Sequence, residues 1–166
     1  MAPSATATKT ASPTVPESAP AAACTTQNLR WTLTRITDPA TGVRDPANAE
    51  LVAVNAGSLS CTLVGYPKLE FHVGKGPQAV GVGKGRPAAV TLEAGKGAVI
   101  ALSYSELNGK GPDSGACVSV TAGAADVAAP GDGTTVRVPV VDQRGRPAQV
   151  TICGDEVHMS PPVARQ

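Results

Sequence analysis

The chain has few aromatic residues and no long apolar run. One Trp, two Tyr and one Phe are present in 166 residues. Since aromatic side chains usually bury large areas, the core must be built mainly from Val, Leu, Ile and Ala. No apolar stretch approaches the roughly 20 residues that span a membrane, so we expect no transmembrane segment. The net charge is only +1, and we expect no nucleic-acid partner because such binders are usually strongly basic.

The chain also lacks the short motifs of common catalytic and metal sites. It contains no G-x-S-x-G, H-E-x-x-H, EF-hand or P-loop pattern. The only histidines are His72 and His158, and each follows a glutamate by two residues. Both occupy the polar phase of a predicted strand, where a surface position is the ordinary outcome. We therefore predict a protein that is not an enzyme and that uses no cofactor or metal ion.

Helical periodicity is nearly absent, whereas turn residues are frequent, with 18 Gly and 15 Pro. Short alternating or β-branched runs are separated by these turn signals. The predicted strands cover residues 29–34, 50–55, 60–64, 68–73, 79–82, 89–92, 98–102, 117–120, 135–140, 149–153 and 156–159. This spacing predicts an all-β protein, an antiparallel immunoglobulin-like β-sandwich of about seven to ten strands.

Four widely spaced cysteines are present, and none forms a C-x-x-C pair. They are Cys24, Cys61, Cys117 and Cys153. An even number at such spacing favours structural disulfides in an oxidising compartment, and hence an extracytoplasmic protein. Three pairings are possible; we prefer Cys24–Cys61 with Cys117–Cys153, since each closes one half of the domain. Each closure is worth about 4 kcal/mol in the loop-entropy model. Four buried free thiols in a cytosolic protein are the alternative.

The N-terminal residues differ in composition from the rest of the chain. Residues 2–23 are almost entirely Ala, Thr, Pro and Ser, which bury too little surface to offset chain entropy. We predict a disordered linker over 1–23, a β-sandwich domain over 24–162 and a frayed C-terminus over 163–166. The linker is a tether or a tail without a role. No signal peptide is visible, so we expect Met1 to stand before a mature secreted segment.

The tripeptide Gly-Lys-Gly occurs four times, at residues 74–76, 83–85, 95–97 and 109–111. Several basic turns could contact one anionic polymer or phospholipid surface. The candidate anion contacts are Lys75, Lys84, Lys96 and Lys110. However, successive hairpin turns tend to point to opposite ends of a sandwich, which would separate the charges. We favour solvated turns, since glycine permits a positive φ and lysine at a turn tip stays hydrated.

Two other groups of side chains are candidates for binding. Four residues in one loop region carry oxygen atoms that suit a hard cation: Asp38, Asp45, Asn48 and Glu50. Their spacing matches no calcium loop, and we favour a role in turns. Trp31 and Tyr66 would form a sugar-stacking platform if they were exposed. Because aromatics are so few, we expect both to serve the core.

Four segments, taken together, resemble a known family. They are Cys24 followed by Leu29; Asn55 followed by Ser60-Cys61-Thr62-Leu63-Val64-Gly65-Tyr66-Pro67; Val90-Thr91-Leu92-Glu93-Ala94-Gly95; and Cys117 with Cys153. In this order they resemble secreted actinobacterial proteins, many of them lipoproteins, that are grouped as domain of unknown function 4232. The resemblance covers roughly residues 24 to 161. It implies export, disulfides and an immunoglobulin-like sandwich, and it carries over no catalytic residue.

We therefore expect a non-enzymatic extracytoplasmic binding module, secreted or tethered to the outer face of the cell membrane. Its partner would be an unknown protein or a cell-envelope polymer, contacted through loops or a sheet face. We expect a monomer. A structural spacer or display domain is the first alternative. A hydrolase whose site assembles only in three dimensions is the second, and it would need His72 or His158 in a pocket beside a nucleophile or carboxylate.

Overall fold

The computed structural model describes residues 2–12, 19–38, 42, 46–106 and 117–166. Within these residues the regular structure is β, apart from the short 3-10 turn η1 (Thr26–Asn28). The strands are β1 (Ala22–Ala23), β2 (Leu29–Arg35), β3 (Ala49–Asn55), β4 (Cys61–Leu63), β5 (Lys68–His72), β6 (Gln78–Gly83), β7 (Val90–Leu92), β8 (Gly97–Ser103), β9 (Ser119–Ala122), β10 (Ala124–Ala128), β11 (Val136–Val141), β12 (Val150–Cys153), β13 (Glu156–Met159) and β14 (Val163–Arg165). The all-β class is confirmed.

The largest sheet closes on itself. Its strand order is β13-β6-β5-β10-β11-β2-β3-β8-β14, and β13 also pairs with β8. β13 runs parallel to β6 and antiparallel to β8, so both of its edges carry hydrogen bonds. The result is a barrel-like ring of eight strands with β14 outside it. The expected immunoglobulin-like sandwich is therefore not clearly present, because a two-sheet sandwich would leave these edges unpaired.

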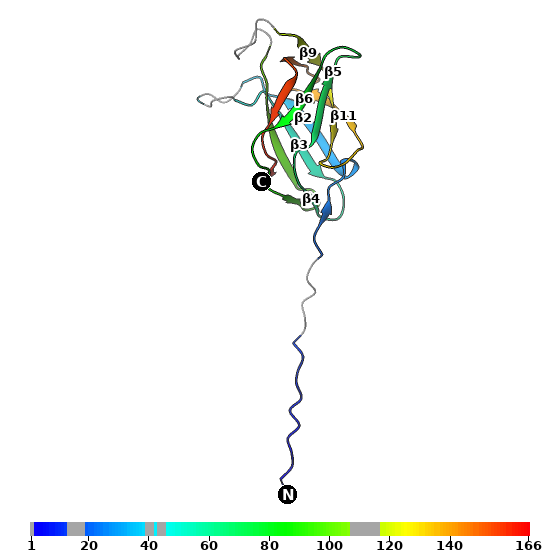
Figure 1. Ribbon diagram of the computed structural model, residues 1–166, viewed down its shortest axis with the longest axis vertical. Coiled ribbons are helices and arrows are strands. Elements are labelled where there is room, and N and C mark those ends of the chain that lie inside the picture. The colour runs from blue at the N-terminus through cyan, green and yellow to red at the C-terminus, as the bar shows by residue number, and fades with distance from the viewer. Residues whose placement is uncertain (1, 13–18, 39–41, 43–45, 107–116) are drawn as a thin grey trace.

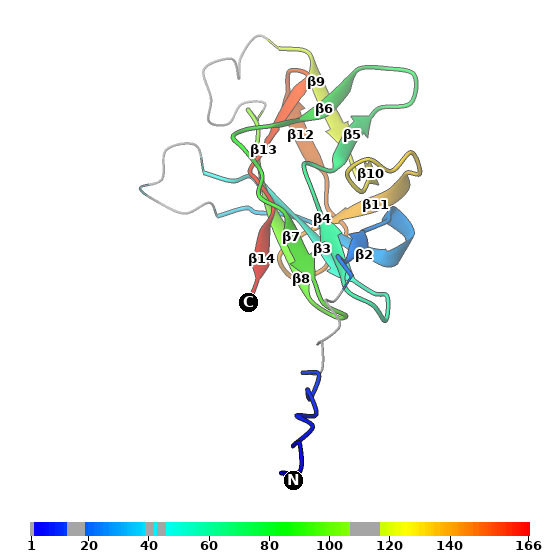
Figure 2. The ribbon, with the colours of Figure 1, turned by 60° about the horizontal axis from the view of Figure 1, so that its bottom comes forward.

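Two small sheets complete the fold. One contains β1, β4 and β7, and the other contains β9 and β12. They lie toward opposite ends of the domain, with β4 near the end where the N-terminal residues enter and β9 at the other end (Figures 1 and 2). We call these the linker end and the β9 end.

The interior contains two groups of buried side chains. The large cluster is centred on residues such as Leu33, Phe71 and Ile152, which are at most 1% exposed. The small cluster lies around Cys24, Cys61, Leu63, Leu92 and their neighbours. Trp31 is half-buried and packs against both clusters. A continuous core of aliphatic side chains with few aromatics is what the composition predicts.

The alternation of strand β5 shows how the sequence sets the inner and outer faces. Leu69 and Phe71 are buried, while Lys68, Glu70 and His72 point outward. Since residues along a strand alternate between its two faces, the polar residues of this strand form a continuous outer row. The outer faces of β5 and its neighbour β10 thereby carry most of the charged contacts described below.

Both ends of the predicted domain are more ordered than the sequence indicated. Ala22 and Ala23 form β1, which pairs in parallel with β4. Residues 163–165 form β14, which pairs with Val99, Ala98 and Gly97 of β8. The prediction of a frayed C-terminus is wrong for these three residues, because the free edge of β8 offers backbone partners that a sequence pattern does not reveal.

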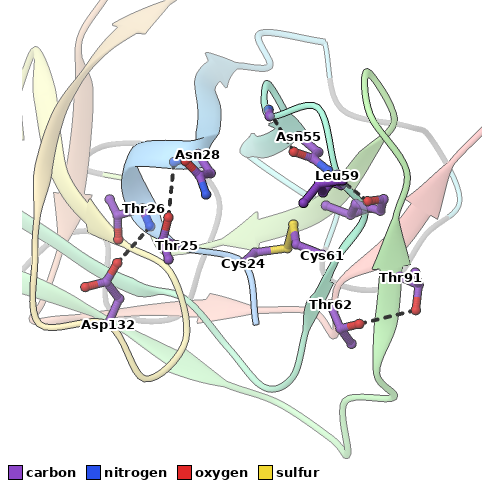
Figure 3. Close-up of a disulfide and its surroundings, with 12 residues drawn as sticks. Cys24, Thr25, Thr26, Asn28, Asn55, Leu59, Cys61, Thr62, Thr91 and Asp132 are labelled. Carbon is purple, nitrogen blue, oxygen red and sulfur yellow. Dashed lines mark hydrogen bonds between the residues drawn. A yellow bond between two sulfur atoms is a disulfide. The ribbon is translucent and has the colours of Figure 1, made fainter. Parts of the chain in front are cut away.

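The two disulfides are Cys24–Cys61 and Cys117–Cys153. This is the preferred pairing, and it is confirmed. Figure 3 shows the first bridge, which joins the residue after β1 to the first residue of β4. Each small sheet therefore carries one disulfide.

Candidate functional site

A hollow of about 410 Å³ opens at the β9 end, beside the Cys117–Cys153 disulfide. Its lining residues are Pro77, Gln78, Cys117, Val118, Cys153, Gly154 and Asp155. They come from the end of the β5–β6 turn and the first residue of β6, from the two residues before β9, and from the last residue of β12 and the turn that follows it. Val118 is 69% exposed there, so its apolar side chain is available to an occupant of the hollow.

Backbone hydrogen bonds fix the wall of this hollow. The Gly154 amide donates to the Val118 carbonyl at 3.0 Å, and the Val80 amide donates to the Asp155 carbonyl at 2.8 Å. Gly154 has a φ of +103°, a conformation that other residues adopt only with strain. The turn after β12 therefore requires glycine at this position. Cys153 precedes Gly154 and Asp155 follows it, and all three residues line the hollow.

The hollow combines apolar and polar groups. Pro77, Val118 and the disulfide supply apolar surface, while Gln78 supplies an amide and Asp155 a carboxylate. Small binding sites usually have this composition, in which a few polar groups orient a partly apolar occupant. The arrangement suits an apolar group that carries a cation or a hydrogen-bond donor nearby.

A row of charged side chains borders the hollow on the outer face of β5, β10 and β11. The Nε2 atom of His72 lies 3.3 Å from Glu70 Oε2 and 3.5 Å from Asp126 Oδ2. Lys68 contacts Glu70 at 3.3 Å, and Arg137 contacts Asp126 at 3.5 Å. Exposed pairs of this kind contribute about 0–1 kcal/mol each to stability.

The position of His72 relative to the hollow follows from the strand register. His72 is opposite Gln78 across the β5–β6 pair, so the row reaches the rim of the hollow. The lining of the hollow nevertheless includes neither histidine. His158 contacts Glu156 at 3.4 Å, and both side chains are substantially exposed.

The candidate cation ligands are not assembled into a site in the described part of the chain. No group of three or more His, Cys, Asp or Glu side chains suited to a metal ion occurs there. Asn48 accepts a hydrogen bond from the Tyr104 amide at 2.8 Å and lies 3.4 Å from Glu106. Glu50 lies within β3, opposite Thr34, and Asp38 is exposed. Asp45 lies outside the described residues.

The lysines of the Gly-Lys-Gly tripeptides occupy different levels of the domain. Lys75 is in the β5–β6 turn, whereas Lys84 follows the other end of β6. Six residues of strand separate these two turns, about 20 Å. Lys96 is in the β7–β8 turn, and Lys110 lies outside the described residues. The described lysines are not brought together.

The linker end is held by two buried polar side chains whose roles the sequence did not reveal. Asn55 is 1% exposed; its Nδ2 donates to the Leu59 and Leu92 carbonyls at 2.8 and 2.9 Å. Its Oδ1 accepts from the Gly57 amide at 2.9 Å. Figure 3 shows this turn leading directly into Cys61. The Asn-Ala-Gly-Ser sequence was a turn signal, but burial of its first residue was not visible in it.

Thr26 ties η1 to the loop after β10. Its backbone amide donates to Asp132 Oδ2 at 2.8 Å, and its hydroxyl oxygen accepts from the Ala129 amide at 2.9 Å (Figure 3 shows Thr26 and Asp132). The hydrogen bond from the Thr26 amide, followed by one from the Thr134 amide, lowers the pKa of Asp132 below its ordinary value. The linker end is therefore closed by both covalent and polar contacts.

Comparison with known protein families gives one match. The model of the family called Domain of unknown function (DUF4232) matches residues 24–161. The chain belongs to this family. No curated protein and no solved structure matches the chain. Among the described residues, no helix has the length and apolar character needed to cross a membrane.

The segment that carries most of the DUF4232 resemblance is structural in this chain. Cys61 forms a disulfide, and the Tyr66 ring packs so closely on Gly83 that it leaves no room for a Cβ atom there. The Tyr66 hydroxyl reaches the carbonyl oxygens of Lys84 and Gly85. Tyr66 thus packs on the end of β6. Trp31 bridges the two clusters and directs its Nε1 to the Thr26 carbonyl at 3.4 Å.

Proposed function

We propose that this DUF4232 domain is a non-enzymatic extracytoplasmic module that binds a protein partner in the hollow beside Cys117–Cys153. One observation carries the proposal. The linker enters at β1, at the linker end, and Figure 1 shows β9 at the opposite end of the domain. The hollow is lined by residues next to β9. A tethered domain with this arrangement presents its hollow away from the point of attachment.

The extracytoplasmic location is supported by the covalent structure. Two disulfides join all four cysteines, and such bridges persist mainly in oxidising compartments. The Ala, Pro, Ser and Thr residues before Cys24 suit an extended spacer. Tethering to the outer face of an actinobacterial membrane, as in a lipoprotein, belongs to the same proposal.

The chemistry of the hollow favours a protein over an envelope polymer. Its exposed valine, proline and disulfide suit an apolar side chain of a partner, which is the usual anchor of a protein interface. The Asp155 carboxylate disfavours an anionic polymer at the same rim. The Gly-Lys-Gly lysines that would attract such a polymer stand at separate levels.

A capture experiment tests the proposal. The domain is immobilised through its N-terminus and incubated with envelope extract and culture supernatant of the producing cells. We expect one protein to be retained, and Val118→Asp to reduce its retention at least tenfold, because a charge would be placed at the hollow's mouth. Val163→Asp is the matched control, since Val163 is 54% exposed on β14 and outside the hollow.

Equal retention by both variants, or retention of nothing, would count against the proposal. The latter result would favour a spacer or display domain. That alternative is supported by the pairing of β1 with β4 next to the Cys24–Cys61 bridge. These contacts attach the linker rigidly to the domain, as a spacer requires. Deleting the domain while keeping its anchor would then change only the height of display.

The hydrolase alternative has one supporting observation, the contact of His72 with two carboxylates. A general base needs its substrate within hydrogen-bond reach. The hollow, where a substrate would be held, is lined by other residues, and we therefore prefer the binding module.

A further inference from the structure

The two disulfides provide a comparison in which loop length is nearly constant. They join residues separated by 37 and 36 positions. The entropy of closing the two loops is therefore nearly the same. Any difference in their reactivity must come from their surroundings in the folded domain.

Those surroundings differ strongly. Cys24 and Cys61 are 3% and 6% exposed and belong to the small cluster. Cys117 is half-buried, and together with Cys153 it lines the hollow. We therefore expect a dissolved thiolate to reach one bridge from the solvent at its Cys117 end, whereas the other bridge requires the linker end to open first.

We propose that Cys117–Cys153 is a site of thiol–disulfide exchange with an external thiol, either a small thiol or a dithiol oxidoreductase, while Cys24–Cys61 is inert in the folded domain. In the first step the external thiolate attacks Sγ of Cys117, the more exposed of the two residues. The disulfide bond breaks, a mixed disulfide forms at Cys117, and Cys153 leaves as a thiolate.

A second external thiolate then completes the reduction. It attacks the external sulfur of the mixed disulfide and releases Cys117 as a thiolate, and both cysteines take up protons from water. The domain gains two electrons and two protons, and two external thiols become one external disulfide. Reoxidation by an external disulfide follows the same path in reverse.

Reduction should release the wall of the hollow without unfolding the domain. β9 and β12 remain joined by four register pairs, from Val150↔Ala122 to Cys153↔Ser119. Val120 and Ile152 on these strands are buried in the large cluster, and they still anchor the pair. If the hollow is the partner site, a point that rests on the proposed function, exchange would alter partner binding.

The hollow's charge gives a prediction about which thiol reacts fastest. Asp155 is exposed on its rim, so its carboxylate favours a cationic reagent over an anionic one. Surface charges within a Debye length of about 8–10 Å act in this way, and salt weakens the effect. Asp155→Asn should therefore reduce the preference for a cationic thiol by about two- to threefold.

The test measures reduction of each bridge separately. The full chain is treated with dithiothreitol for graded times, quenched with iodoacetamide, and the labelled cysteines are quantified by peptide mass spectrometry. We expect Cys117 and Cys153 to be labelled at least tenfold faster than Cys24 and Cys61. In 6 M guanidinium, where burial is lost, the two bridges should react at similar rates.

Two variants sharpen this test. Val118→Trp covers the mouth of the hollow and should slow native reduction of Cys117–Cys153 several-fold, without changing the rate in denaturant; Val163→Trp is the control. The rates of reduction by cysteamine, a cationic thiol, and by 2-mercaptoethanesulfonate, an anionic thiol, are compared between the parent and the Asp155→Asn variant. For each reagent, the rate in the folded domain is divided by the rate in denaturant.

Equal native rates for the two bridges, or faster labelling of Cys24 and Cys61, would overturn the proposal. Loss of the β circular-dichroism spectrum on selective reduction would overturn the local release of the wall. These rates need no partner protein, so a failed capture experiment leaves them unaffected, and slow exchange leaves the binding proposal standing.

Discussion

The two ends of the domain use the same covalent device in different settings. At the linker end, Cys24–Cys61 is buried beside Asn55 and Thr26, which satisfy the backbone groups of the surrounding turns. At the β9 end, Cys117–Cys153 lines an open hollow next to exposed Val118. The comparison teaches that a disulfide's role depends on what encloses it. The first bridge fixes the junction with the linker, and the second shapes a surface.

Removing each bridge gives the largest expected effects. Loop closure contributes about 4 kcal/mol to either bridge. Cys24→Ala with Cys61→Ala also leaves a cavity in a packed cluster, so we expect a loss of about 5 kcal/mol in the free energy of unfolding. The pair Cys117→Ala with Cys153→Ala should lose about 4 kcal/mol or less. Denaturant titration of both variants measures this, and an equal or reversed order would break the comparison.

The buried amide at the linker end should matter more than its counterpart toward the β9 end. Asn55→Ala leaves the Leu59 and Leu92 carbonyls and the Gly57 amide without their partner, and we expect a loss of about 3 kcal/mol. Asn48→Ala is the matched control, because Asn48 is half-buried and contacts Tyr104 and Glu106.

For Asn48→Ala we expect a loss of about 1 kcal/mol in the free energy of unfolding, measured in the same titration. If Asn48→Ala were the more damaging variant, the linker end would not be the more firmly closed of the two.

Acid should weaken the linker end through Asp132. Its folded pKa is lowered, first by the hydrogen bond from the Thr26 amide, so folding favours the charged carboxylate. This stabilisation is fully present above the ordinary Asp pKa of about 3.9 and is lost as the pH falls through the lower folded pKa. Asp132→Asn should therefore reduce the fall in unfolding free energy on acidification.

Thermal unfolding at a series of pH values from 7 to about 2.5 checks this, across the range where Asp carboxylates titrate. Asp155→Asn, at the β9 end, is the control. Identical acid dependence in Asp132→Asn and the parent would show that the Thr26 contact is not made in solution.

Much of the strand pattern was predictable from local sequence, because alternation and turn residues act over a few positions. Leu69 and Phe71 were expected to face inward, and both are buried. β10 was missed, since its sequence Ala-Ala-Asp-Val-Ala has little β-branched character. It forms because it lies between β5 and β11 and bonds to both.

The hollow could not be predicted, because its lining comes from three separate parts of the chain. Pro77, Val118 and Asp155 have no common motif. They meet because β13 pairs with β6 and because β9 pairs with β12, where the disulfide adds a covalent link. Val118 was assigned to a strand, and nothing in its neighbours indicated that it would be exposed.

The sequence alone determined the β class and the aliphatic core, since propensity and alternation are local properties. For the four cysteines it left three pairings open, and the preferred one is the pairing that the structure contains. The tertiary structure decided that the sheet closes through β13, that β14 joins it, and that one bridge is buried while the other borders a hollow. These outcomes depend on which strand edges meet across the fold, and an edge becomes available only when all the other strands are in place.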